Sequence, residues 1–142
     1  MIFLDLRGRE KKLKNAYRYK VDWSGGTRSK GQTALKKFLY PYWKDKIVFE
    51  EMPLVGSRMS FDIVNITDKL IIEHQGLQHQ QFVKHFHGSR TSKFLGQIKR
   101  DMKKHEWCEI NEFTLLETYS EKDFTYEFFL SKGIELWIAG SM

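Results

Sequence analysis

Apolar and polar positions in residues 29–75 follow a pattern that predicts one helix and then three strands. Ser29 can cap a helix over 29–45, because the residues after it place apolar side chains at helical spacing. Pro41 should end or kink this helix near its last turn. Three apolar runs with strand-like alternation come next, at 47–52, 58–66 and 70–75. Short turns separate these runs, so we expect an antiparallel meander packed on the helix.

The second half of the chain predicts further helices and strands. The expected elements are a loop over 77–91, a helix over 92–110, a strand over 113–119, a helix over 121–131 and a short edge strand over 134–138. The apolar stripe of the longer helix comprises Phe94, Leu95, Ile98 and Met102. The expected fold class is α/β: a helix, a three-stranded antiparallel meander, then a helix, a strand and a C-terminal helix around a mixed central sheet.

Charge is distributed unevenly along the 142 residues, whose number suits a single domain. Residues 1–46 hold 13 Lys and Arg against 4 Asp and Glu, a balance of +9, whereas 47–142 hold 11 against 14, a balance of −3. We therefore expect an irregular basic arm over 1–28 and one domain over 29–142. Excess positive charge favours a polyanionic partner, with DNA foremost, although a solvated tail would look the same. The arm residues expected to contact phosphates are Arg7, Arg9, Lys11, Lys12, Lys14 and Arg18.

The expected location is the cytoplasm, without a membrane partner. Asp5 and Arg7 interrupt any apolar run that could act as a signal peptide, and no apolar stretch is long enough to cross a bilayer. The single cysteine, Cys108, excludes an internal disulfide and is typical of a reducing compartment. The oligomeric state stays open between monomer and homodimer.

Two acidic residues stand where the strands should be apolar. Asp62 lies in the middle of the second strand, on the face of Val64 and opposite Phe61 and Ile63, and Glu73 lies near the end of the third. A tight turn would bring both carboxylates together, at a cost of several kcal/mol that a divalent cation removes. Oxygen ligands suit Mg²⁺ or Mn²⁺. The structural alternative is a surface glutamate and an aspartate in an ion pair.

The same residues belong to a longer pattern with a family resemblance. FDIV, LIIEHQGLQHQQF and FLGQIKRDMKKHEWCEINEFTLLE, within residues 30–120, resemble the PD-(D/E)XK nuclease superfamily. The nearest branch is that of phage and homing-associated endonucleases, which is related to the very-short-patch-repair nucleases. The resemblance implies a restriction-endonuclease-like core and an Mg²⁺-dependent endonuclease that cuts DNA, of the homing or nicking type, leaving a 5′-phosphate. A phage source would place the protein in the host cytoplasm.

The resemblance also implies residue roles around the metal. Asp62, Glu73 and the backbone carbonyl of His74 would bind the ion. Gln75 occupies the position at which the superfamily usually has lysine, which leaves open the group that orients the attacking water. His79 is the candidate for that role, as a general base or as a donor to the phosphate.

Residues of the expected loop and second helix complete the implied site. Gln78 in the loop and Arg100 on the helix would contact the phosphate or hold the site, and Asp101 and Lys104 would lie near the point of cleavage. Relatives carry a glutamate near the start of the first helix, where this chain has Gln32. Glu51 on the first strand of the meander could substitute for it.

Several alternatives remain open on the sequence. The departures at Gln75 and Gln32 permit a catalytically inactive nucleic-acid-binding module on the same fold, and the aromatic residues and basic arm permit an RNA-binding protein. A zinc site could use histidines and the cysteine, namely His85, His87, His105 and Cys108. No His–Asn–His hairpin of the HNH type can be placed. Cys108 as a nucleophile has no support, and a small buried apolar residue is its default role.

Overall fold

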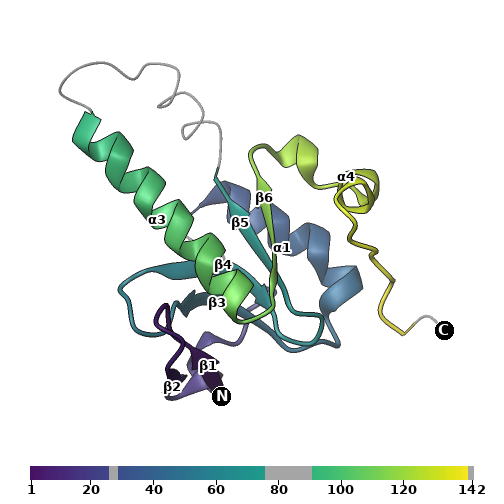
Figure 1. The fold of residues 1–142 in the computed structure, drawn as a ribbon. Helices are drawn as coiled ribbons and strands as arrows, with labels where there is room; N and C mark the ends of the chain where they lie inside the picture. The colour runs from purple at the N-terminus through teal and green to yellow at the C-terminus, as the bar shows by residue number, and fades with distance from the viewer. Residues whose placement is uncertain (26–28, 76–90, 141–142) are drawn as a thin grey trace.

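The structure is a computed structural model that describes residues 1–25, 29–75 and 91–140 (Figure 1). It is an α/β fold, as expected, with one four-stranded mixed sheet and a separate two-stranded sheet. The helices and main-sheet strands are α1 (Lys30–Trp43), β3 (Val48–Pro53), β4 (Ser60–Asn65), β5 (Leu70–His74), α3 (Thr91–Ile110), β6 (Thr114–Thr118) and α4 (Tyr126–Ser131). The small sheet pairs β1 (Ile2–Leu4) with β2 (Glu10–Lys12), and two 3-10 turns are η1 (Ala16–Tyr19) and η3 (Glu121–Asp123).

The main sheet has the strand order β3-β4-β5-β6. Its first three strands are antiparallel, which confirms the predicted meander, and β6 joins parallel to β5. A parallel neighbour requires the chain to cross over the sheet, and α3 lies in this connection. Figure 1 shows α3 running obliquely across one side of the sheet, with α1 on the other.

Both faces of the sheet are buried, in two separate cores. Val64 and Ile71 pack toward Trp107 of α3, whereas Ile63 and Ile72 pack toward Leu35 of α1. Alternation along the strands therefore supplies each core from every second residue. The sheet is held between helices, so polar side chains at its strand ends lie close to helix-borne groups.

Phe61 breaks this alternation. The predicted pattern placed it with Ile63, but its ring lies 5.2 Å from that of Trp107, in the other core. The backbone explains the difference: the pairs Glu50↔Ile63 and Met52↔Phe61 flank Glu51, whose φ of 53° is left-handed. This local irregularity lies on β3 next to the part of β4 that carries Asp62.

Helix α1 begins and ends much as predicted. Ser29 is its N-cap, and its side-chain oxygen accepts a hydrogen bond from the Gln32 N–H at 3.2 Å. Pro41 lies in the last turn, and the helix ends two residues later at Trp43. The Pro41 carbonyl accepts from the Ala139 N–H at 2.8 Å, which ties the C-terminal segment to this helix.

The irregular conformation expected for residues 1–28 is wrong for β1, β2 and η1. Asp5 shapes the β1–β2 hairpin by accepting from the N–H groups of Arg7 and Arg9, both at 2.9 Å. Phe3 and Leu13 are buried in the core on the α3 side. The hairpin therefore packs on the domain, because its few apolar residues are spaced to reach that core.

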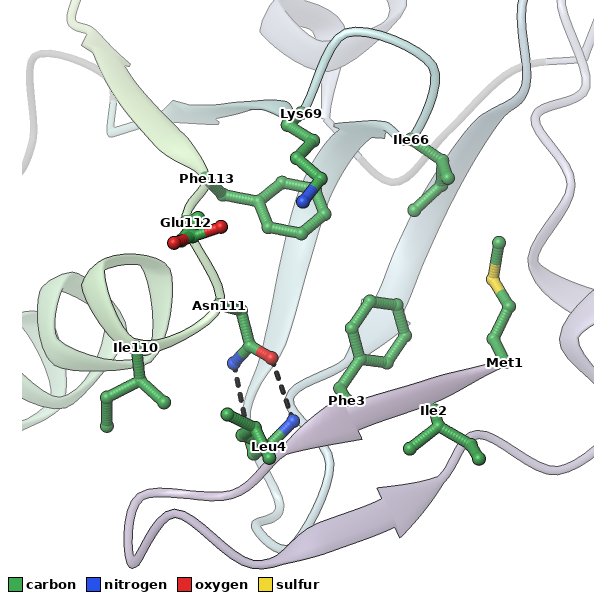
Figure 2. Close-up of a pocket in the computed structure, with 10 residues that line it drawn as sticks. All are labelled: Met1, Ile2, Phe3, Leu4, Ile66, Lys69, Ile110, Asn111, Glu112 and Phe113. Carbon is green, nitrogen blue, oxygen red and sulfur yellow. Dashed lines mark hydrogen bonds between the residues drawn. The ribbon is translucent and has the colours of Figure 1, made fainter.

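Asn111 fastens this hairpin to the end of α3 (Figure 2). Its Oδ1 accepts from the Leu4 N–H at 2.8 Å, and its Nδ2 donates to the Leu4 carbonyl at 2.9 Å. A cavity of about 530 Å³ lies beside this contact, between apolar side chains such as Phe3 and Phe113 and the stem of Lys69. Lys69 immediately precedes β5, so the cavity lies at the opposite end of that strand from Glu73.

Three expectations for the second half need correction. The stripe on α3 is not a core face, because Leu95 and Met102 are 49% and 57% exposed, and the buried residues of α3 among those described are Trp107 and Cys108. The predicted helix over 121–131 is interrupted: η3 ends at Asp123, and the Thr125 side chain caps α4 separately. Residues 134–138 form no strand. No helix in the described ranges is long and apolar enough to span a membrane.

Candidate functional site

Asp62 and Glu73 lie side by side where β4 and β5 separate, as predicted. The backbone pairing of the two strands ends at Ile63↔Ile72. Beyond it, the Asp62 N–H donates to Glu73 Oε2 at 3.0 Å, and the His74 N–H donates to Asp62 Oδ2 at 2.8 Å. Each carboxylate thus accepts a hydrogen bond from the backbone of the opposite strand, and these bonds fix the positions of both side chains.

A lysine from α3 reaches the same carboxylates. Lys104 Nζ forms an ion pair with Glu73 Oε1 and lies 5.8 Å from the centre of the Phe61 ring. Its side chain is largely buried, and the Glu73 side chain is only 4% exposed. The site therefore combines two acidic groups and one basic group from three elements, and of the α3 residues expected there, Lys104 makes the direct contact.

The two carboxylates of the site ionise less readily than usual despite the nearby Lys104. The pKa of Glu73 is raised to about 8, chiefly by burial and then by the Asp62 charge, against the opposing effect of Lys104. Burial also raises the pKa of Asp62, with Glu51 adding to the rise and hydrogen bonds from the site opposing it. At neutral pH the pair therefore retains a proton in the absence of another cation.

His74 anchors the end of β5 from the opposite face of the sheet. Its Nδ1 lies 2.8 Å from Thr118 Oγ1, and its ring contacts that of Phe124 at 5.3 Å. Gly31 in the first turn of α1 leaves room for this ring: a Cβ there would lie 2.3 Å from His74 Nε2. Burial lowers the pKa of His74. The imidazole thus holds the strand end in place, and the role of its backbone carbonyl toward a metal stays a prediction.

A second polar cluster adjoins the pair on β6. Glu117 is the register partner of Glu73 and lies on the same side of the sheet. Its carboxylate contacts His105 Nε2 at 2.7 Å and accepts from the Tyr119 hydroxyl at 2.7 Å. Burial raises the pKa of Tyr119 to about 12, and the bond to Glu117 contributes. Consecutive residues of α3, Lys104 and His105, therefore contact carboxylates on neighbouring strands.

Sequence reasoning missed Glu117 as a site residue. Its one signal was an acidic residue inside an otherwise apolar strand, the same signal that drew attention to Asp62 and Glu73. When a parallel strand follows a long crossover, the spacing of nearby residues does not determine its register. Only the pairing Glu73↔Glu117 shows that the two carboxylates are neighbours.

Of the other predicted site residues, some lie on α3, one follows β5 and two lie outside the described residues. Arg100 and Asp101 lie one turn before Lys104 on α3, joined through Gln97, which accepts from Arg100 at 2.9 Å and donates to Asp101 at 3.2 Å. Gln75 follows β5 and donates its N–H to the Thr118 carbonyl at 2.8 Å. Gln78 and His79 lie outside the described residues.

Of the two candidates for a third acidic position, Glu51 acts on the site. Its charge contributes to the raised pKa of Asp62. Gln32 is buried, and its Nε2 finds no hydrogen-bond partner among the residues that the structure describes. In the described part of the chain, no three His, Cys, Asp or Glu side chains are grouped so as to hold a metal ion.

The structure describes two of the four ligands named for the zinc alternative, and it does not support either of them. His105 faces Glu117, whereas Cys108 is buried in the core beside Trp107. Burial raises the pKa of the Cys108 thiol to about 12, which keeps it protonated and agrees with the apolar role expected for it. His85 and His87 lie outside the described residues.

The basic residues expected to contact DNA lie on the surface of the hairpin and the segment after it. Each of the six is exposed: Arg7, Arg9, Lys11, Lys12, Lys14 and Arg18. Arg9 also pairs with Asp5 at 3.5 Å, a contact of small energetic weight because the Arg9 side chain is mostly exposed. The charge predicted for an irregular basic arm therefore lies on a folded element.

Comparison with known proteins places the chain among viral proteins. It is 30% identical over 128 residues to "Uncharacterized protein 094L" of Frog virus 3, a match that covers 84% of this chain and 81% of that protein. The chain belongs to the 094L family. No protein-family model matches the sequence, and no solved structure matches the fold.

Two proteins of invertebrate iridescent viruses resemble this 094L-family chain over part of their length. Protein 033L of Invertebrate iridescent virus 3 is 30% identical over 118 residues, which are 75% of this chain and 60% of that protein. Protein 307L of Invertebrate iridescent virus 6 is 41% identical over 89 residues, 58% of this chain and 45% of that protein. The chain thus spans less than two thirds of either relative, and both carry the description "uncharacterized".

Proposed function

We propose that this protein is a metal-dependent endonuclease that hydrolyses DNA phosphodiester bonds on a PD-(D/E)XK, restriction-endonuclease-like core. One observation carries the proposal: Asp62 and Glu73 are held together at the point where two strands separate, next to a cationic side chain. Adjacent buried carboxylates are costly in a purely structural role, and a hard cation with a phosphate would use both.

The donor set suits Mg²⁺ or Mn²⁺. Both groups offer carboxylate oxygens, and the pKa of Glu73 is raised by burial and by the Asp62 charge, which a bound cation would offset. Mg²⁺ is usually bound in proteins by one or two carboxylates, with water and substrate phosphate oxygens as the remaining ligands. The Asp62 and Glu73 carboxylates therefore match a site that DNA would complete, with the His74 carbonyl as a further ligand in this proposal.

Lys104 takes the place of the strand lysine that Gln75 does not provide. A divalent cation at this site would lower the pKa of a water molecule and stabilise charge on the phosphate. Lys104 contacts Glu73 from α3, so its ammonium group can bind a phosphate oxygen or orient the attacking water from the helix side. The Gln75 amide is then a neutral hydrogen-bonding group. Water would attack in line, and the 3′ oxygen would leave.

The basic hairpin supports DNA as the substrate. Its exposed Lys and Arg residues provide attraction to phosphates that does not depend on sequence. This attraction would hold the duplex, while the Asp62–Glu73 site would determine where the bond breaks. A plasmid assay measures whether one or both strands are cut, because nicked and linear products differ.

Nicking of supercoiled plasmid in Mg²⁺ or Mn²⁺ tests the proposal. Asp62→Asn and Glu73→Gln should each lower the rate by about 100-fold or more, because each removes a proposed ligand. The matched control is Asp68→Asn, which removes an aspartate paired with Lys46 at the other end of the same strands. A wild-type protein that never nicks in either metal would overturn the proposal. Product ends should carry 5′-phosphate, and 3′-phosphate would contradict the cleavage scheme.

A catalytically inactive nucleic-acid-binding module is the second candidate. The Lys104–Glu73 ion pair favours it, because that pair satisfies one carboxylate without any metal. Under this alternative, wild type and Glu73→Gln would bind duplex DNA equally and neither would cleave it. The same plasmid assay, run beside a gel-shift measurement, separates the two functions.

A further inference from the structure

A pair of aromatic rings, one exposed and one partly buried, lies at the outer side of α1. Trp23 and Tyr40 meet edge to face, with ring centres 5.8 Å apart and planes at 72°. Tyr40 is 46% exposed, whereas Leu39 next to it on α1 is fully buried. One side of Trp23 packs on the α1 core, so the ring is anchored while its other parts stay accessible.

The turn before α1 fixes the Trp23 ring in place. Asp22 Oδ1 accepts three hydrogen bonds: from the Ser24 N–H at 3.2 Å, the Ser24 hydroxyl at 3.0 Å and the Gly25 N–H at 3.0 Å. Such an Asx turn restricts the backbone on both sides of Trp23. The two rings thus form a rigid angle, which a flat ligand can enter without a large ordering cost.

Two cavities open onto this angle. One, of about 540 Å³, is lined by Trp23, Ser24, Lys37 and Tyr40. The second, also about 540 Å³, shares Trp23 and extends toward the exposed ring of Tyr17. Because Trp23 lines both, the two hollows adjoin and form one elongated aromatic surface.

Positive charge surrounds the rings. Lys44 Nζ lies 5.9 Å from the centre of the Tyr40 ring, and Lys37 lines the first cavity. Neither of these lysines, nor Lys20, forms an ion pair within the described ranges, whereas Lys46 is paired with Asp68. The Asp22 carboxylate accepts hydrogen bonds from its own turn. The surface thus offers flat rings and unpaired ammonium groups at the same place.

We propose that this surface binds unpaired nucleotides of a single-stranded nucleic acid. A base would stack on Trp23 or Tyr40, and the adjoining phosphates would contact Lys37 and Lys44, the combination that single-strand-binding proteins use. Bases in a duplex are stacked inside it and cannot reach such an angle. The site is separate from the carboxylates, since it lies on α1 rather than between the sheet and α3, and it does not require that they be catalytic.

Oligonucleotide binding in EDTA tests the inference, because no metal-dependent cleavage can then occur. The probes are single strands of thymidine or uridine of about twelve nucleotides, and a duplex of the same length. The thymidine strand should quench tryptophan fluorescence and bind at least about 10-fold more tightly than the duplex at moderate salt. The uridine strand distinguishes RNA from DNA as the source of the unpaired nucleotides, and preferred binding of either supports the site.

Two tryptophan variants give a matched comparison. Trp23→Leu should lose most of the quenching and weaken single-strand binding by about 10-fold. Trp137→Leu, which removes another exposed tryptophan outside this surface, should leave both unchanged. The Lys37→Ala, Lys44→Ala double variant should lower the salt slope of single-strand binding, and thermal unfolding verifies that each variant is folded.

Three results would overturn the inference: equal affinity for single strand and duplex, unchanged binding in a folded Trp23→Leu protein, or no binding of either strand. Preferential capture of a peptide or protein over both strands would also refute it. Failure here leaves the plasmid-nicking result intact, and failure to nick leaves this binding result intact, because EDTA separates the two measurements.

Discussion

Lys104 of α3 forms an ion pair with Glu73 of β5, yet burial and the adjoining Asp62 still raise the pKa of Glu73 to about 8. The two carboxylates therefore do not both ionise at neutral pH in the absence of another cation. This property is measurable without knowledge of the substrate.

The stability of the metal-free protein should fall as pH rises from 5 to 8. Folded Glu73, with a pKa of about 8 against an ordinary value of 4.5, keeps a proton that the unfolded chain has lost. Its contribution is fully present below the unfolded pKa and is lost as pH rises through the folded one. Urea unfolding in EDTA should show a loss between these pH values that exceeds that of Glu73→Gln by about 1–3 kcal/mol. Equal losses would show that Glu73 ionises normally.

Mg²⁺ should stabilise the protein, and more strongly at pH 8 than at pH 6. Binding requires an ionised Glu73, so the ion must displace a proton at the lower pH. Thermal unfolding against Mg²⁺ concentration measures the effect through mass action. Asp62→Asn should abolish the shift and Asp68→Asn should retain it. A shift that survives in Asp62→Asn would place the ion elsewhere.

Lys104→Met should separate metal binding from catalysis. The lysine competes with a cation for Glu73, so its removal should leave Mg²⁺ affinity unchanged or tighter. The nicking rate should nevertheless fall by about 100-fold, because the group that holds phosphate or water is gone. Lys103→Met, at an exposed neighbouring position, serves as the control. A variant that binds metal and still nicks at the wild-type rate would remove Lys104 from the mechanism.

Gly31→Ala should destabilise the fold and disturb the carboxylates from behind the sheet. The new methyl group would meet the His74 ring at 2.3 Å, and His74 donates its backbone N–H to Asp62. We expect a loss of about 1–3 kcal/mol. Gly96→Ala in α3 is the control, since its nearest neighbour is Arg100 Nη1 at 3.6 Å, and it should gain about 0.5–1 kcal/mol. Urea unfolding of both variants measures these changes in the free energy of unfolding.

The hairpin lysines should set the salt dependence of duplex binding. Lys11 and Lys12 are exposed on β2, and each phosphate contact adds about 0.9 to the slope of log affinity against log salt concentration. Lys11→Ala, Lys12→Ala should therefore reduce that slope by up to about 2 while the fold persists. An unchanged slope would assign the phosphate contacts to another surface.

Local signals predicted the elements that local chemistry determines. The Ser29 cap, the meander and the meeting of Asp62 with Glu73 follow from short-range spacing and tight turns. The split before α4 was not predicted, but it could have been, since Ser120 and Thr125 are both capping residues. These features need no information from distant parts of the chain.

What the sequence could not supply is the identity of each element's neighbours. Helical spacing groups Leu95, Ile98 and Met102 on one face, but it does not say that nothing described packs against that face. Glu117 becomes a neighbour of Glu73 because β6 pairs in parallel with β5, and α3 separates these two strands in the sequence. Phe61 changes core because Glu51 adopts a left-handed backbone, which no propensity of glutamate would indicate.

The contact between Leu4 and Asn111 joins residues 107 positions apart. During synthesis on the ribosome, the hairpin emerges long before the helix end that receives it. Until then, Phe3 and Leu13 have no core to enter, because Trp107 and Phe113 are still to be made. A nascent chain thus exposes these two apolar side chains, next to many basic residues, through most of its translation.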